Sequence, residues 1–526
     1  MEKNPPKEQE AIKNYQNLKD SSFDFERIGL LFQHEDKSSY HQVITDRTCR
    51  DLDFDELFMV LDRTHSSIGQ QYLYQVLRTI PKSEERSERF EKIISYYKSN
   101  PDFQKGMIDE LENLSDQGAY FLQHLMQSGN LKKPRWFWVI PMLSGMSIAT
   151  LVLLFFFPVL PVFILLVAIN IMFHYWNKTN VMTYSNSIPQ LIKLRNVSLF
   201  LHEHQEVLED KIVFKEAFHQ VDSIANSAIF FKWESKLSGE IGQIGEYFFE
   251  LIKATFLLEP ILIYRISESL EIHGKEIREL FHEVATIDVA ISIAAFREDL
   301  PYYAIPTTSD SLDIEGMFHP MITDPVPNSI VPAEGKSVLV SGSNMSGKTT
   351  FIRTVGINGL LAQTIHTTCA KSFSLPLLKI HSAVRIMDDL FEDVSYYLEE
   401  VKVIKEMIDQ CKSEDRNLFL LDELFKGTNT IERVASGKAV LSYLSQKGNM
   451  VFASTHDLEL MDFLSESYEF YHFEGTVEED QLKFDFKLKK GRWSKTNAIR
   501  ILEVNGFPKE VTEDAKALAD EMKKAK

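Results

Sequence analysis

One phosphate-binding motif constrains the fold of this 526-residue chain more than any other feature. Residues 342–349 read Gly-Ser-Asn-Met-Ser-Gly-Lys-Thr, which matches the pattern G-x-x-x-x-G-K-[ST]. An apolar run at 336–341 predicts a strand before the motif, and a helical pattern follows it. Glycines let backbone amides curl around phosphate oxygens at the N-terminus of a helix. This context predicts a nucleotide-binding P-loop, also called a Walker A motif.

The P-loop gives individual residues expected roles. Lys348 would reach the β- and γ-phosphates, and Thr349 would coordinate a metal ion. The cofactors predicted from this motif are therefore ATP and Mg²⁺. The predicted cofactor-binding residues are Gly342, Ser343, Asn344, Met345, Ser346, Gly347, Lys348, Thr349 and Thr350.

Two further apolar runs end in polar residues that would complete such a site. Residues 418–421 lead directly into Asp422 and Glu423, which is a Walker B pattern. In P-loop enzymes this aspartate holds Mg²⁺, so Asp422 and Thr349 are the predicted metal ligands. The adjacent Glu423 can polarise the attacking water. The run that starts at Val451 ends at His456, a position from which a side chain can sense the γ-phosphate.

The spacing of apolar residues divides the chain into a helical part and an α/β part. Between about 53 and 300 the spacing is mostly helical, as in the i, i+3, i+4, i+7 pattern that begins at Phe54. From about 311, short apolar runs alternate with helical segments, which predicts a mostly parallel sheet. We predict an α-helical core domain in residues 1–130 and 179–305, followed by an α/β P-loop ATPase domain in residues 306–526.

An uncharged stretch interrupts the helical core. Residues 136–176 contain no Asp, Glu, Lys or Arg, and the part before Pro158 is about long enough to cross ~30 Å of hydrocarbon as a helix. A second apolar run follows Pro161, and basic residues flank both ends of the stretch. We therefore predict an inserted transmembrane helical hairpin at 131–178. The alternative is a helical hairpin buried inside a soluble core.

The predicted hairpin implies that the protein is located in a membrane and contacts lipid. Positive charge at both of its ends would place both ends on the cytoplasmic side. We expect a membrane protein that contacts lipid through residues 136–176, with both termini and the ATPase domain cytoplasmic.

Several motifs resemble those of the MutS family of DNA mismatch repair ATPases, in the same order. Residues 342–353 are similar to the family's Gly-Pro-Asn-Met-Gly-Gly-Lys-Ser-Thr P-loop and its following arginine, and the Asn-Met pair is distinctive of MutS proteins. Residues 422–430 resemble Asp-Glu-Ile-Gly-Arg-Gly-Thr-Ser-Thr, and residues 453–456 resemble Ala-Thr-His. Residues 395–400 resemble Ser-Thr-Phe-Met-Val-Glu. Weaker likenesses lie at 55–69, 287–294, 318–320, 491–495 and 507–511.

This resemblance implies an ABC/MutS-type ATPase domain and a homodimer with composite ATP sites. It implies that Ser395 reaches the γ-phosphate of the other subunit's ATP, and that His456 senses the γ-phosphate of its own. The expected catalytic residues are thus Glu423, Lys348, His456 and Ser395. The sequence also departs from the family pattern. Ser343 replaces a proline, and we find no context for the Phe-x-Glu mismatch reader, which indicates a variant without the mismatch-reading domain.

The sequence leaves two main alternatives for the function of the protein. The family default is ATP-driven movement of the helical core, linked to mismatch repair or to binding of irregular DNA. The rival is a membrane-bound, nucleotide-gated module that acts on an unidentified protein partner without DNA. A transport ATPase is disfavoured because no Leu-Ser-Gly-Gly-Gln signature is present. The formal charge of −19 excludes a general polyanion binder, so we expect only weak duplex binding.

Overall fold

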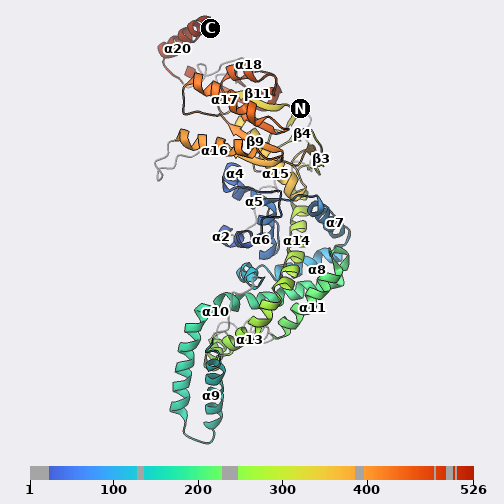
Figure 1. Cartoon of the computed structure of the whole chain (residues 1–526), viewed down its shortest axis with the longest axis vertical. Helices are drawn as coiled ribbons and strands as arrows, with labels where there is room; N and C mark the ends of the chain where they lie inside the picture. Colours follow the sequence, from blue (N-terminus) through green and yellow to red (C-terminus); the bar gives the residue numbers. More distant parts are fainter. Residues whose placement is uncertain are drawn as a thin grey trace.

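The structure of the protein is a computed structural model. It describes residues 23–126, 135–227, 247–385, 396–478, 481–492, 502–503 and 506–525. The molecule is elongated, with a sheet-containing part at one end, a helical part in the middle and a long helical hairpin at the other end (Figure 1).

Helices make up the central part. Its first half contains α2 (Phe25–Ile28), α3 (Leu30–His34), α4 (Asp46–Asp51), α5 (Phe54–Leu61), α6 (Ser67–Arg78), α7 (Glu85–Ser99), α8 (Pro101–Glu112) and η1 (Gln117–Met126). A short antiparallel pair, β1 (Gln42–Val43) and β2 (Thr79–Ile80), lies among them. The chain returns through η2 (Gln205–Val207), α11 (Lys211–Ser227), α13 (Leu258–Ile272) and α14 (Gly274–Asp299). Helix α14 packs against α6, α7 and α11, so one long helix joins both halves.

A six-stranded sheet forms the core of the C-terminal part. Its order is β12-β11-β6-β10-β9-β8, and only β12 runs antiparallel to its neighbour. The strands are β6 (Ser337–Gly342), β8 (Lys379–Ala383), β9 (Asn417–Asp422), β10 (Met450–Ser454), β11 (Tyr468–Glu478) and β12 (Gln481–Lys490). A second sheet has the order β3-β7-β4-β5. Its strands are β3 (Thr307–Thr308), β4 (Asp313–Met317), β5 (Asn328–Ile330) and β7 (Ser372–Leu375).

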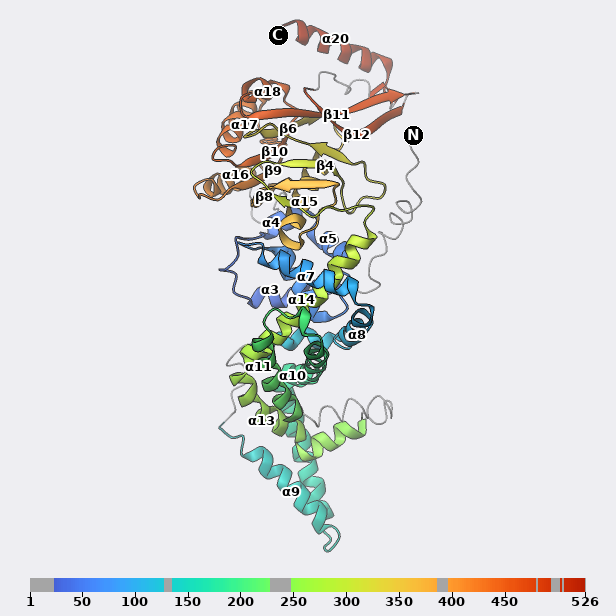
Figure 2. The same cartoon turned by 90° about the vertical axis from the view of Figure 1, so that its right-hand side faces the viewer.

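Helices cover both faces of the six-stranded sheet, which explains why its central strands are buried and apolar in their middle residues. Alternate side chains of β9 enter different cores: Leu418 and Leu420 pack on the side of α15 (Lys348–Ile365), and Phe419 and Leu421 on the other side. That other core contains residues of α16 (Tyr396–Gln410), α17 (Thr430–Leu444) and α18 (Leu458–Leu464). Figure 2 shows α15 between the sheet and the helical part. A final helix, α20 (Lys509–Ala525), lies at the far end.

The predicted transmembrane hairpin is wrong. None of the helices in the described part of the chain is long and apolar enough to cross a membrane. The uncharged stretch forms a hairpin of α9 (Val139–Leu153) and α10 (Leu160–Glu203), but α9 has only 15 residues, or about 22 Å. The apolar part of α10 is interrupted by Asn170 and His174, which are both buried. The predicted membrane location is therefore wrong as well, and lipid contact through residues 136–176 has no support.

A buried carboxylate joins the two halves of the helical part. Asp288 on α14 is fully buried and accepts hydrogen bonds from the backbone N–H groups of His65 and Ser66, at 2.8 and 2.9 Å, and from the Ser66 hydroxyl at 2.5 Å. It thus satisfies backbone donors just before α6. A side chain at Gly69 would meet this carboxylate, since an added Cβ would lie 2.0 Å from Asp288 Oδ2.

A second cluster of polar contacts connects the helical part to the sheet part. Arg297, near the end of α14, donates to both carboxylate oxygens of Glu91 on α7, at 3.0 and 2.5 Å. It also donates to the Thr367 hydroxyl and the His366 carbonyl, just beyond α15. Burial alone would raise the pKa of Glu91, but hydrogen bonds from His366 and Arg297 outweigh it and hold that pKa at about 2. The two parts are therefore joined through an ionised carboxylate.

Candidate functional site

The predicted P-loop connects β6 to α15, and its backbone conformation requires glycine at two positions. Gly342 has φ +147° and Gly347 has φ +104°, both in the region that favours glycine. At Gly342 an added Cβ would lie 2.7 Å from the carbonyl oxygen of Phe473, so a larger residue would clash with β11. The loop leaves its amides at the N-terminus of an 18-residue helix, where phosphate groups bind readily.

Lys348 begins α15 and is buried, with 5% of its surface exposed. Its Nζ donates to the carbonyl oxygens of Gly342 and Ser343, both at 3.0 Å. Burial lowers the pKa of Lys348, and the carboxylates of Glu423 and Asp422 oppose that shift. The loop thus holds the ammonium group close to its own backbone.

Two hydroxyl groups flank the carboxylate of Asp422 at the end of β9. Thr349 Oγ1 donates to Asp422 Oδ2 at 2.9 Å, and Ser454 Oγ donates to Asp422 Oδ1. Ser454 is the last residue of β10, and it pairs with Asp422 in the parallel register of the sheet. The resulting set of hydroxyl and carboxylate oxygens consists of the hard ligands that Mg²⁺ prefers. The residues present therefore fit the predicted metal.

Glu423 lies at the centre of the polar network, with a left-handed backbone (φ +54°). His456 Nε2 is 2.6 Å from Glu423 Oε1, and Lys426 Nζ is 3.3 Å from Oε2. Burial alone would raise the pKa of Glu423, but the hydrogen bond and charge of His456, together with Lys426, hold it at about 2. Glu423 is therefore ionised at neutral pH. His456 Nε2 also lies 3.4 Å from Lys348 Nζ, so His456 stands between the P-loop lysine and this carboxylate.

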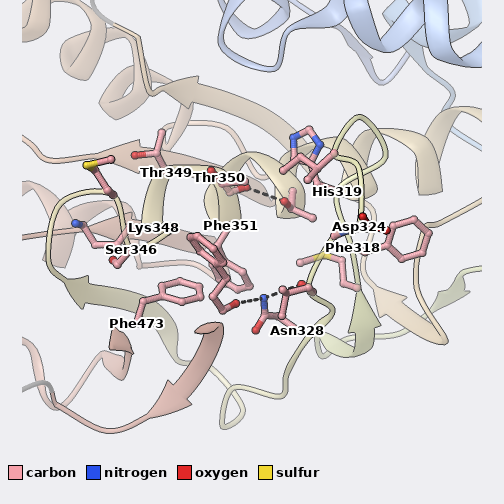
Figure 3. Close-up of a pocket in the computed structure, with 18 of the residues that line it drawn as sticks. Phe318, His319, Asp324, Asn328, Ser346, Lys348, Thr349, Thr350, Phe351 and Phe473 are labelled. Carbon is pink, nitrogen blue, oxygen red and sulfur yellow. Dashed lines mark hydrogen bonds between the residues drawn. The ribbon is translucent and has the colours of Figure 1, made fainter. Parts of the chain in front are cut away.

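A cavity of about 440 Å³ opens beside the P-loop (Figure 3). One side is formed by P-loop residues, and the opposite side by the segment between β4 and β5, which includes Phe318, His319 and Asp324. Phe486 of β12 and Phe473 of β11 complete the lining. Asn328 fixes this wall because its side-chain amide donates to the carbonyl oxygen of Phe486 at 3.1 Å.

Sequence reasoning did not identify several of these wall residues as part of the site. Phe318 and His319 line the cavity, but in the sequence only a weak family likeness at 318–320 marks them. Asn328 and Phe486 are 158 positions apart and carry no local motif, so only the fold brings them together. Ser395, the remaining predicted catalytic residue, lies outside the described residues.

Helix α16, which follows Ser395 in the chain, is attached to the loop after Glu423. Glu400 on α16 is buried, and its Oε1 accepts a hydrogen bond from the backbone N–H of Phe425. Phe425 has φ +58°, the second left-handed residue of this short loop. Burial raises the pKa of Glu400, and the hydrogen bond from Phe425 opposes the shift. The position of α16 and the backbone that carries Glu423 are therefore linked.

The parallel sheet, the P-loop and the polar residues at the ends of β9 and β10 define the class of P-loop nucleotide-binding proteins. Comparison with known proteins narrows this class. Residues 338–523 match the family described as MutS domain V. These residues include the P-loop, Asp422, Glu423 and His456, whereas the cavity wall between β4 and β5 lies before the matched range.

Curated relatives extend the likeness. The chain is 30% identical over 270 residues to the DNA mismatch repair protein MutS of Thermus thermophilus, covering 50% of this chain and 33% of that protein. It is 27% identical over 267 residues to the protein of that name from Natronomonas pharaonis, covering 49% of this chain and 31% of the relative. The chain thus spans about a third of the length of these relatives. About half of this chain is thus similar to MutS proteins, and residues 338–523 are similar to MutS domain V.

The burial of His319 predicts sensitivity to mild acid. Burial lowers the pKa of His319 to about 4, although the nearby Asp53 opposes the shift. Between pH 6.5 and pH 4 the unfolded chain therefore binds a proton that the folded chain does not bind. Folded-state stability should fall as pH decreases through this window, by roughly 3 kcal/mol for this one group.

Urea unfolding at pH 7 and pH 4.5 measures this effect. The variant His319→Gln should lose less stability than the wild type over that interval. His219→Gln, at an exposed histidine on α11, is the matched control and should behave like the wild type. An equal loss in His319→Gln and wild type would show that His319 does not cause the acid sensitivity.

Proposed function

We propose that this chain is a MutS-type ATPase that binds ATP with Mg²⁺ and hydrolyses it. The observation that supports this most is the convergence of Lys348, Asp422, Glu423 and His456 at neighbouring strand ends, with Lys348 and Glu423 lining the cavity beside the P-loop. The match to MutS domain V covers the same residues. Purified full-length protein should release phosphate from ATP, and the Lys348→Ala variant should show weaker nucleotide binding and little turnover.

In the proposed reaction, each polar residue has a separate role. Glu423, ionised and half-buried, orients the attacking water and accepts its proton. Lys348 and His456 interact with the γ-phosphate and stabilise the charge that develops there. Thr349 and Asp422 would hold Mg²⁺, which when bound neutralises charge on the β- and γ-phosphate oxygens. Ser343 and the other P-loop residues bind phosphate mainly through their backbone amides, so the exchange of the family's proline for serine leaves this role unchanged.

We also propose that two parts of the chain have different roles. Residues 306–526 form the ATPase domain, and residues 1–130 and 179–305 form a helical core that moves in response to it. The contacts of Arg297 with Glu91, Thr367 and the His366 carbonyl support this proposal, because they join α14 to the end of α15. Helix α15 begins at the P-loop, so a change at the phosphates has a direct structural route to the helical core.

A homodimer with shared sites is the proposed assembly. In this arrangement Ser395 of one subunit contacts the γ-phosphate bound to the other. The link from Glu400 to Phe425 supports the idea, because it couples the helix after Ser395 to the loop of Glu423 in the same subunit. Closing the interface on ATP would therefore affect both sites.

Mixing two inactive variants tests the shared site. Ser395→Ala and Lys348→Ala homodimers should each be nearly inactive in ATP hydrolysis. A mixture contains heterodimers in which one site keeps both functional halves, so we expect partial recovery of the rate. The Lys348→Ala protein mixed with itself at the same total concentration is the control. Wild-type activity in Ser395→Ala alone would contradict the shared-site proposal.

The proposed substrate class is DNA of irregular structure, since the curated relatives are named as DNA mismatch repair proteins. With a formal charge of −19, the chain should bind a matched duplex no more tightly than the non-specific range of ~10⁻⁴–10⁻⁶ M at physiological salt. An anisotropy titration with matched and mismatched duplexes measures this. Nanomolar binding with a clear preference for the mismatch would contradict our expectation and would establish direct mismatch recognition. The alternative of a membrane-bound module is no longer favoured, because it depended on the transmembrane hairpin.

A further inference from the structure

A buried polar cluster lies at the base of the helical hairpin, far from the P-loop. It consists of His174 on α10, Glu250 on the helical segment 247–256, and Glu259 on α13. His174 and Glu259 each have only 2% of their surface exposed, whereas the Glu250 side chain is 37% exposed. Figures 1 and 2 show α13 beside α10 where the hairpin joins the rest of the molecule. The cluster thus lies where separate helical segments meet.

The three polar atoms of this cluster are separated by distances similar to those between the ligands of one metal ion. His174 Nε2 is 3.7 Å from Glu250 Oε2 and 3.9 Å from Glu259 Oε2, and all three atoms lie within 4.8 Å of one another. These separations are too long for hydrogen bonds, which are roughly 2.7–3.2 Å. Two ligands that each lie about 2.1 Å from one tetrahedral metal ion are separated by roughly 3.4 Å. Side-chain movements of a few tenths of an ångström would therefore bring these atoms to coordination distance.

The histidine itself points to a ligand. Within the part of the chain that the structure describes, neither ring nitrogen of His174 has a hydrogen-bond partner. A buried imidazole that lacks such partners carries a cost in free energy, because it has given up its hydrogen bonds to water. Its Nε2 instead lies near two carboxylate groups. Coordination of a cation between these groups would satisfy the nitrogen and neutralise the carboxylates together.

Neighbouring residues fix the frame around the cluster. Asn170 lies one turn before His174 on α10 and is fully buried. Its amide donates to the hydroxyl of Ser147 on α9 at 2.8 Å and to the carbonyl oxygen of Thr255 at 2.7 Å. The two carboxylate oxygens of Glu250 face different residues. Oε1 lies 3.4 Å from Lys253 Nζ, and Oε2 faces His174. The segments that carry His174 and Glu250 are thus held together by other contacts.

We propose that His174, Glu250 and Glu259 bind a divalent transition metal ion, with Zn²⁺ as the best fit. Imidazole nitrogen favours such ions over Mg²⁺ and Ca²⁺, and Zn²⁺ accepts one histidine and carboxylate oxygens at about 2.0–2.2 Å. Three protein ligands leave a fourth position for water. The ion would fasten α13 and segment 247–256 to α10, and so fix the base of the hairpin relative to α14, which follows α13.

Metal retention by the full-length protein tests this proposal. Protein purified without a histidine tag is treated with EDTA, desalted, and incubated without nucleotide in a twofold excess of ZnCl₂. After a second desalting step, bound zinc is measured by mass spectrometry. The wild type should retain close to one Zn²⁺ per chain and should show a higher melting temperature with zinc than with EDTA. MgCl₂ in place of ZnCl₂ should produce neither effect.

The variants His174→Gln and Glu250→Gln should each weaken zinc binding at least tenfold and abolish the zinc-dependent shift in melting temperature. Glu250 is partly exposed, so this variant keeps the test valid if His174→Gln folds poorly. His219→Gln, at an exposed histidine, is the control and should bind zinc like the wild type. Retention of no zinc by the wild type, or equal retention by wild type and both variants, would overturn the proposal. A histidine–carboxylate ion-pair cluster would then be the correct description.

Discussion

Replacing Glu423 by glutamine is expected to leave ATP bound while hydrolysis falls by at least ~10²-fold, the scale of lost general-base assistance. Glutamine keeps the size of the side chain but cannot accept a proton from water. The effect should be large because Glu423 lines the cavity beside the P-loop, with its Oε1 only 2.6 Å from His456 Nε2, so it is placed to orient a water at the γ-phosphate. The left-handed backbone at residue 423 also remains accessible to glutamine at similar cost.

Single-turnover hydrolysis and binding of a fluorescent ATP analogue separate the two properties. Glu432→Gln provides a matched control, because Glu432 is an exposed carboxylate at the start of the nearby α17 and lies outside the cavity. It should hydrolyse ATP like the wild type. If Glu423→Gln hydrolyses ATP at the wild-type rate, Glu423 does not position the water. If it loses ATP binding as well, its contacts with His456 maintain the pocket rather than the reaction.

The second large effect concerns stability. Asp288→Ala should destabilise the helical part by about 3 kcal/mol or more, because it leaves two backbone N–H groups and one hydroxyl buried without their acceptor. Asp288→Asn should cost less, since its remaining carbonyl oxygen can still accept. Gly69→Ala should be destabilising through the same contact, because its Cβ would meet the carboxylate of Asp288.

Urea unfolding followed by circular dichroism at pH 7 measures these changes. Asp109→Ala serves as the control, because Asp109 is an exposed aspartate on α8 in the same part of the molecule. Its unfolding midpoint should remain close to that of the wild type. Asp288→Ala protein with an unchanged midpoint would mean that other contacts hold α6 against α14.

The central strands could be predicted because their burial leaves a plain mark on the sequence. Strands β6, β9 and β10 lie between two layers of helices, so almost every residue in them is buried and their central residues are apolar. Parallel strands end at one edge of the sheet, which explains why Asp422 and His456, far apart in the chain, both lie near Lys348. The walls of the cavity could not be predicted in this way. The contact between Asn328 and Phe486 depends on how β5 meets the edge strand β12, and no short motif encodes that.

The hairpin shows how composition alone can mislead. The absence of charge in residues 136–176 predicts two membrane spans, but α9 ends at Leu153 and leaves only 15 residues in the first helix. The second helix contains Asn170 and His174 on its buried side, where they contact or approach polar groups of other helices. Asparagine and histidine are not included in a count of Asp, Glu, Lys and Arg. They nevertheless determine which groups a helix packs against.

Helix α14 has a mechanical consequence that follows from its length. It has 26 residues, so it is about 39 Å long. One end is held by Arg297 at the sheet part, and the other, at Gly274, packs against the end of η1 near the base of the hairpin. A rigid rod of this length converts a small rotation into a large displacement. A tilt of about 10° at the Arg297 end would move the Gly274 end by about 6 Å, slightly more than one helical turn.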